Sequence, residues 1–185
     1  MESIDFSKVT ISKPRNFQSN DGQFCFVNND TSKLIVDIKG CKLAYNVDMS
    51  YAKPNMYFYS NQKLTNFNEQ VKHVIIKGVY SMGLYGNTLN VQQLEEMYCD
   101  PRKIKPVGKI FQDTIKCKLV NKTDIPLTKK SKVNITIHVV GVWISEYSFG
   151  PYYNVTDVEA HKDVHTCLIV ENESDNESDI EINSC

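Results

Sequence analysis

Residues 133–143 read VNITIHVVGVW, and up to residue 139 the odd positions are branched apolar residues while most even positions are polar. Successive side chains of a strand point to opposite faces of a sheet, so this period of two predicts a strand with one buried face. Gly141 interrupts the stretch, which is typical of a bulge or a bend. The predicted buried face consists of Val133, Ile135, Ile137 and Val139.

Weaker strand patterns lie on both sides of this stretch. Residues 34–38 and 56–59 are short runs rich in branched or aromatic side chains, and a last strand is expected to start at Tyr152. Residues 42–51 alternate only loosely. The apolar run at residues 71–77 fits either a buried strand or the end of a helix, because short runs fit both.

Residues 115–119 alternate cleanly between apolar residues and lysines. We expect Ile115, Cys117 and Leu119 to face the core, with Lys116 and Lys118 on the opposite face. The polar residues 121–131 that follow are interpreted as a hairpin connection to the strand at 133–143.

One segment favours a helix. Asn90 can accept from free N–H groups at a helix start, and Gln93 stands where the second member of a capping box stands. Pro101 is expected to end the helix. Many short strands with one short helix favour a β-barrel or β-sandwich. The expected buried stripe of the helix is Val91, Leu94, Met97 and Tyr98.

Composition divides the chain into a body and a tail. The 185 residues carry a net charge of −1, but residues 171–185 hold six acids and no base, which leaves 21 bases against 16 acids in residues 1–170. We therefore predict one domain at 1–170 and a disordered acidic tail at 171–185. No apolar run is long enough to span a bilayer. The start MESIDFSKVT lacks a secretory pattern, so we expect an intracellular protein of the cytoplasm or nucleus, neither secreted nor membrane-bound.

Patterns typical of catalysis or metal binding are weak. The six cysteines form no C-x-x-C pair, and reduced thiols are expected. His161, His165 and Cys167 resemble part of a zinc site, but a fourth ligand at suitable spacing is missing. Phosphate-loop, serine-hydrolase and metalloprotease motifs are absent. The sequence therefore predicts no enzyme, no cofactor and no metal.

Basic and aromatic residues favour nucleic-acid binding. Residues 101–132 contain ten Lys or Arg and two acids, and lysines of this kind can contact phosphates. Aromatic faces stack on bases of any sequence. Aromatic residues that flank the turn near residue 148 are expected to be exposed, whereas Trp143 is expected in the core, with stacking on a ligand as its open alternative. The candidate nucleic-acid-binding residues are Arg102, Lys103, Lys105, Lys109, Lys116, Lys118, Tyr147, Phe149 and Tyr152.

The acidic tail suggests regulation of such a site. It can occupy a basic groove when nucleic acid is absent and recruit replication proteins when nucleic acid displaces it. Two isoleucines near its end could anchor a partner. The candidate partner-binding residues are Glu177, Asp179, Ile180, Glu181 and Ile182.

Several motifs together resemble a family of small proteins from large double-stranded DNA viruses. These motifs are IDFSKVTISKP from Ile4, YNVDMSY from Tyr45, residues 111–119 and residues 133–150. The ending at GVW and SFG is also similar to bacteriophage single-stranded DNA-binding proteins of the OB-fold type, which carry an acidic tail. Pro151 and the two tyrosines after it depart from the pattern expected there, and residues 157–170 have no counterpart. The resemblance spans residues 3–156 and implies an OB-like, partly open barrel.

These observations converge on one hypothesis with an alternative. We expect a viral single-stranded DNA-binding protein that coats replication or recombination intermediates without strong sequence preference. RNA remains open as a second ligand, and so does homo-oligomer formation. The alternative is a protein–protein interaction module or a minor virion protein on the same β scaffold.

Overall fold

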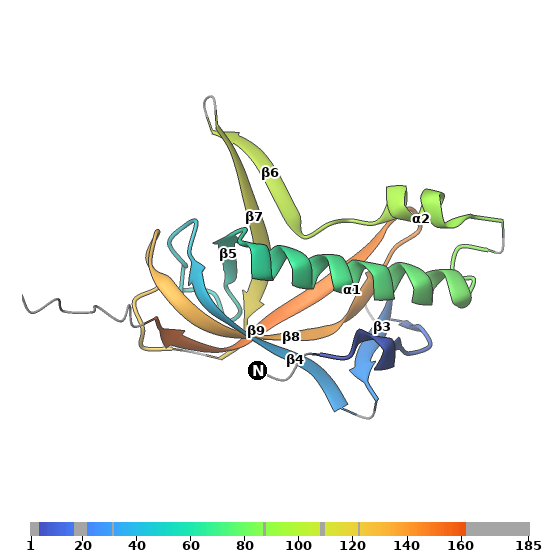
Figure 1. Cartoon of the computed structure of the whole chain (residues 1–185), viewed down its shortest axis with the longest axis horizontal. Coiled ribbons are helices and arrows are strands. Elements are labelled where there is room, and N and C mark those ends of the chain that lie inside the picture. Colours follow the sequence, from blue (N-terminus) through green and yellow to red (C-terminus); the bar gives the residue numbers. More distant parts are fainter. Residues whose placement is uncertain are drawn as a thin grey trace, which may run out of the picture.

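The structure is a computed structural model that describes residues 4–16, 22–30, 32–86, 88–107, 110–121 and 123–161, with side chains for all of these except 103–107 and 110–112. Within these ranges the chain forms nine strands, two α-helices and one short 3-10 helix (Figure 1). In chain order they are η1 (Phe6–Lys8), β1 (Val9–Ile11), β2 (Arg15–Asn16), β3 (Gln23–Asn29), β4 (Ser32–Lys42), β5 (Asn55–Tyr59), α1 (Gln62–Ser81), α2 (Val91–Met97), β6 (Arg102–Val107), β7 (Ile110–Leu119), β8 (Lys132–Ile144) and β9 (Phe149–Ala160).

Five of these strands form a partly open barrel. β8 pairs with β4 and β9, and β7 pairs with β9 and β5. The resulting strand order is β4-β8-β9-β7-β5. A single bridge between Leu43, just after β4, and Phe58 in β5 brings the two end strands together. The β7–β9 pairing is parallel, while the other ladders of the ring are antiparallel. A partly open, five-stranded barrel with this crossed connectivity is OB-like, so the predicted mainly β fold is confirmed.

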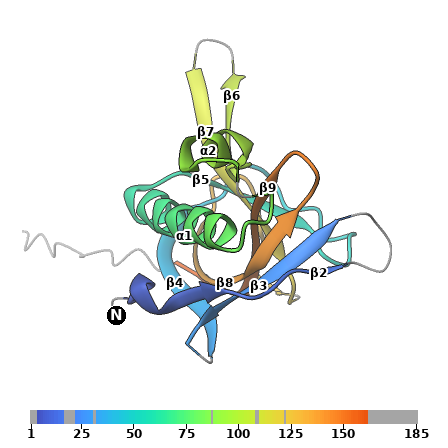
Figure 2. The same cartoon turned by 90° about the vertical axis from the view of Figure 1, so that its right-hand side faces the viewer.

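The barrel carries additional strands at two places. β3 pairs with β8 and with the short strands β1 and β2. β6 pairs with β7, and together they form an arm that projects from the barrel (Figures 1 and 2). The arm and the barrel share β7: its residues 110–115 pair with β6, and its residues 114–119 pair with β5 or β9.

β8 is the central strand, as its alternation predicts. All four residues of the expected face, from Val133 to Val139, are buried. The register with β9 shifts between Val139 and Gly141, which confirms the predicted irregularity. A Cβ at Gly141 would overlap the Cys25 carbonyl oxygen and lie 2.5 Å from the Phe24 ring. Glycine at position 141 therefore allows β3 to pair with β8 at this short distance.

The run at residues 71–77 belongs to a long helix, so the prediction of one short helix was wrong. α1 begins after Asn61, whose side chain accepts from the Leu64 N–H at 2.9 Å. Its buried residues recur with the helical period and pack against the barrel and against β1. They are Leu64, Phe67, Asn68, Val71, Ile75, Ile76 and Val79.

The shorter helix α2 begins as predicted. Asn90 and Gln93 form both hydrogen bonds of a capping box, each at 2.9 Å. Leu94 is buried, but Val91 is 46% exposed, so it does not belong to the buried stripe. The helix ends at Met97, four residues before Pro101, because Tyr98 turns into an extended bridge to Phe149.

Two connections differ from the predictions. Beyond the bridge at Leu43, residues 44–54 form a loop rather than a strand. The segment 121–131 links β7 to β8, which are not neighbours in the sheet, so it is not a hairpin turn. Among the described residues, neither helix is both long and apolar enough to cross a membrane.

Candidate nucleic-acid interface

A cleft opens where the barrel is incomplete, between β7 and β9. These strands pair only at Lys118–Asn154 and Leu119–Val155, and from there they diverge. The cleft has a volume of about 560 Å³. It is lined by the segment from Cys99 to Arg102, by Lys116, Cys117 and Lys118 of β7, by Trp143 of β8, and by Pro151, Tyr152 and Tyr153 of β9.

The two lysines of β7 lie on one side of this cleft. Ile115, Cys117 and Leu119 are buried, whereas Lys116 and Lys118 are half-buried on the outer face, as predicted. Lys118 Nζ approaches the Lys53 carbonyl oxygen at 3.5 Å, which is a weak contact. Lys116 stands in register with Tyr57 of β5. Neither ammonium group forms an ion pair among the described residues, so both charges remain available to a ligand.

Two aromatic side chains lie on the other side. Trp143 pairs in register with Gly150, and Tyr152 pairs with Gly141. A Cβ at Gly150 would lie 2.9 Å from Trp143 Cζ2, so the indole lies directly over the glycine. The expectation that Trp143 belongs to the core was wrong: glycine on the neighbouring strand lets the indole lie flat on the outer face, where it is half-buried and lines the cleft.

A hydrogen-bonded network holds the end of the cleft near α1. Tyr153 donates its hydroxyl to Asn68 Oδ1 at 2.9 Å, and Asn68 donates to Asp100 Oδ1 at 3.2 Å. Arg102 donates twice to Asp100 Oδ2, at 2.9 and 2.6 Å, and pairs with Glu69 at 2.7 Å. The network joins α1 to β9 and to the base of the arm.

Arg102 is therefore occupied by carboxylates, and the expectation that it contacts phosphate is not supported by its surroundings. Its hydrogen bonds to Asp100 raise its pKa further, against the opposing effect of burial. Burial also raises the pKa of Tyr153, which remains a neutral hydrogen-bond donor.

The predicted turn aromatics separate into different environments. Phe149 is fully buried and packs against Tyr85 and Tyr98, so it cannot stack on a base; β9 begins at Phe149, whose side chain points inward. Tyr147 is 75% exposed at the β8–β9 turn, outside the cleft. Tyr152 is half-buried and lines the cleft.

The remaining candidates lie on the arm or outside the described residues. In the arm, Lys103 is in register with Thr114, and Lys105 with Gln112. Lys109 and the tail residues Glu177, Asp179, Ile180, Glu181 and Ile182 lie outside the described residues, and so do His165 and Cys167. His161 Nδ1 is 2.8 Å from Asn134 Oδ1. No group of metal-ligating side chains occurs in the described part of the chain.

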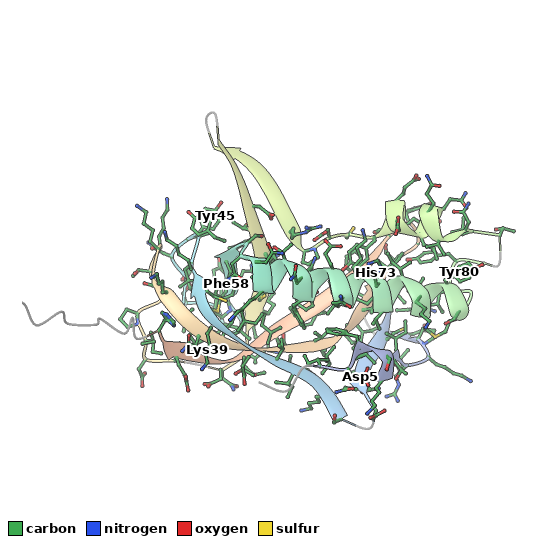
Figure 3. The ribbon with its side chains drawn as sticks, viewed as in Figure 1. Asp5, Lys39, Tyr45, Phe58, His73 and Tyr80 are labelled. Carbon is green, nitrogen blue, oxygen red and sulfur yellow. The ribbon has the colours of Figure 1, made fainter. Side chains whose placement is uncertain are left out.

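A tyrosine group beside the lysines was not singled out from the sequence. Tyr45 of the β4–β5 loop contacts Tyr57 edge to face, with centroids 5.5 Å apart. Tyr45 lies at the rim of the barrel and Phe58 points into it (Figure 3). Tyr51 in the same loop is exposed. Because Tyr57 neighbours Lys116, aromatic side chains flank the lysines on both sides.

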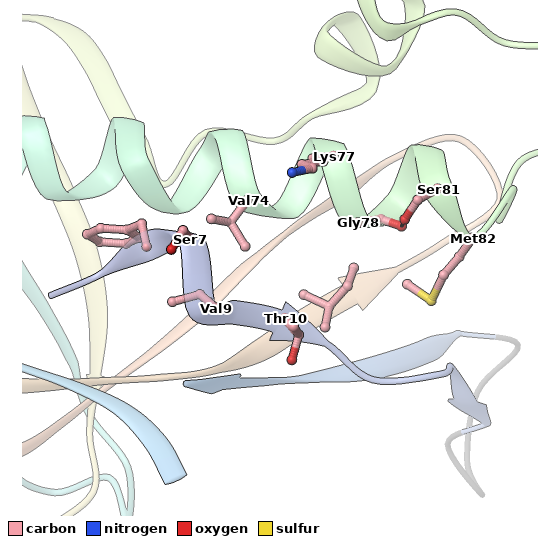
Figure 4. A pocket seen from close by; sticks show the side chains of 10 residues that line it. Ser7, Val9, Thr10, Val74, Lys77, Gly78, Ser81 and Met82 are labelled. Carbon is pink, nitrogen blue, oxygen red and sulfur yellow. Dashed lines mark hydrogen bonds between the residues drawn. The ribbon is translucent and has the colours of Figure 1, made fainter. Parts of the chain in front are cut away.

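A second hollow lies between α1 and the N-terminal segment (Figure 4). It has a volume of about 330 Å³ and contains one basic side chain, Lys77. The side chain of Ile11 packs directly onto Gly78 in this region and fixes η1 and β1 to the helix. This hollow therefore serves the packing of the chain's own N-terminal segment.

The chain was compared with known proteins at three levels. No protein-family model, no curated protein and no solved structure matches it. Functional inference therefore depends on the chemistry of the cleft.

Proposed function

We propose that this protein binds single-stranded nucleic acid, DNA in the first place, through the cleft between β7 and β9. The observation that supports this function best is the placement of Lys116 and Lys118 opposite Trp143 and Tyr152. Lysines of this kind attract phosphates, and aromatic faces bind bases without regard to sequence. The site therefore favours binding with little sequence preference.

The position of the aromatic side chains favours single strands over duplexes. Trp143 of β8 and Tyr152 of β9 are half-buried in the lining of the cleft. A base reaches them only if it is unstacked from its neighbours and free of its pairing partner. Such bases are available in single strands, whereas a duplex keeps both faces of each base covered.

Coating of replication or recombination intermediates is the biological setting that we propose. It rests on the resemblance of the sequence to the viral family and to phage single-stranded DNA-binding proteins. The alternative, a protein-docking surface, is less favoured because the large exposed apolar side chains are scattered, apart from Tyr45, Met49 and Tyr51 in the β4–β5 loop. Tyr147 lies on the β8–β9 turn, Tyr80 on α1 and Ile35 on β4.

The test is fluorescence anisotropy of the full chain with a labelled oligo(dT) and with a duplex of equal length. We expect salt-sensitive binding of the single strand and weaker binding of the duplex. Tyr152→Ala should weaken binding, whereas Tyr147→Ala, which removes an exposed tyrosine outside the cleft, should not. Absence of binding to oligo(dT) at micromolar protein would reject the proposed function.

A further inference from the structure

We propose that the cleft receives one extruded nucleobase, which stacks on the indole of Trp143, while the adjoining phosphates stay at Lys116 and Lys118. This inference rests on the proposed function and adds how the strand is held. It assigns a base subsite to the gap between β7 and β9 and a phosphate subsite to the outer face of β7.

Gly150 fixes the stacking platform. The position of a Cβ on Gly150 lies 2.9 Å from Trp143 Cζ2 and 3.1 Å from Cε2, so one face of the indole rests on the backbone of β9. On the opposite strand of the sheet, Phe24 pairs with Trp143 in register. The indole is thus held against β9 before any ligand arrives. A ring fixed in this way loses little conformational freedom when a base stacks on it.

Charge decides which end of a nucleotide enters. Asp100 lines the cleft, and Glu69 lies beside it, with Arg102 as the cation that both contact. At this end of the cleft the three groups sum to one negative charge, which disfavours a phosphate there, whereas Lys116 and Lys118 line the β7 side. The N–H groups of a base edge are compatible with that charge, and the two lysines of β7 attract the phosphates.

The dimensions leave room for a nucleobase. The volume of about 560 Å³ falls within the range of small-ligand pockets. Cys99 contributes an exposed thiol to the lining, so the rate at which this thiol is alkylated reports whether the cleft is occupied.

Trp143 is the chain's single tryptophan, so its fluorescence reports on the cleft alone. The full-length protein is titrated with oligo(dT) and with an abasic oligonucleotide of equal length, while anisotropy of a 5′ label measures binding. We expect oligo(dT) to quench Trp143 and the abasic strand to bind without quenching. Because the abasic strand lacks the stacked base, it should bind at least about 5- to 150-fold more weakly than oligo(dT), which is the contribution of one stacked base.

Two further measurements keep the outcomes distinct. Bound oligo(dT) should slow the alkylation of Cys99, followed by mass spectrometry of its peptide, whereas the abasic strand should protect it less. Tyr152→Ala should reduce the quenching, and Tyr147→Ala should preserve it; circular dichroism verifies that both variants are folded. If oligo(dT) binds by anisotropy but leaves Trp143 and Cys99 unchanged, the base subsite is wrong and the proposed function stands. If no strand binds, both are rejected.

Discussion

Replacing Lys116 and Lys118 together by alanine should change the salt dependence of binding by a calculable amount. Both ammonium groups lie on the outer face of β7 without an ion pair among the described residues. For single strands, each phosphate contact contributes about 0.7 to the slope of log K against log salt, so the slope should fall by about 1.4. A fourfold increase in salt would then weaken the variant about sevenfold less than the wild-type protein.

The assay is anisotropy of labelled oligo(dT) over a series of salt concentrations. The matched control replaces Lys33 and Lys39, two exposed lysines of β4, which changes the net charge equally on a strand that does not line the cleft. Thermal unfolding of each variant verifies that the barrel is intact. An unchanged slope in the β7 variant, or an equal reduction in both variants, would refute the placement of phosphates at β7.

Three other perturbations test the fold, the cleft and the tail. Gly141→Ala should lower the free energy of unfolding by about 2 kcal/mol or more in urea titrations, because the added Cβ has no room. Gly22→Ala is the control and should have little effect, because its Cβ would lie 3.4 Å from the nearest atom. Alkylation of the native protein near neutral pH should modify the exposed Cys99 well before the buried Cys41. Burial raises the pKa of Cys41 to about 11 and leaves almost none of it as thiolate. Equal alkylation rates by peptide mass spectrometry would contradict this expectation. Deleting residues 171–185 should tighten oligo(dT) binding at low salt, because an acidic competitor is removed, and an unchanged affinity would exclude autoinhibition by the tail.

Local patterns in the sequence were sufficient for elements whose cause is local. The alternation around Ile135 identified β8, and the pair Asn90 and Gln93 identified the start of α2. α1 was missed because the run at residues 71–77 was considered alone. Its helical period becomes visible only when the run is extended back to Leu64 and forward to Val79.

The cleft could not be located from the sequence, because it depends on a non-local pairing. Residues of β7 and β9 meet through two parallel pairs, and strands that far apart in the chain leave no local signal. The same limit explains the errors at single residues. Proximity to a turn suggested that Phe149 is exposed, but its place in β9 turns it inward. The lysine-rich context suggested that Arg102 is free, but folding brings Glu69 of α1 to it.

The short parallel contact between β7 and β9 has a mechanical consequence. Ladders of backbone hydrogen bonds fix the spacing between β4 and β8, between β8 and β9, and between β5 and β7. Between β7 and β9, the pairing is limited to Lys118–Asn154 and Leu119–Val155, and no further ladder fixes the width of the gap. That width depends instead on side chains, chiefly on the chain of contacts from Tyr153 through Asn68 and Asp100 to Arg102. The barrel therefore has a compliant seam, which would let the base subsite that we propose adjust to purines and pyrimidines of different size while every strand ladder stays intact.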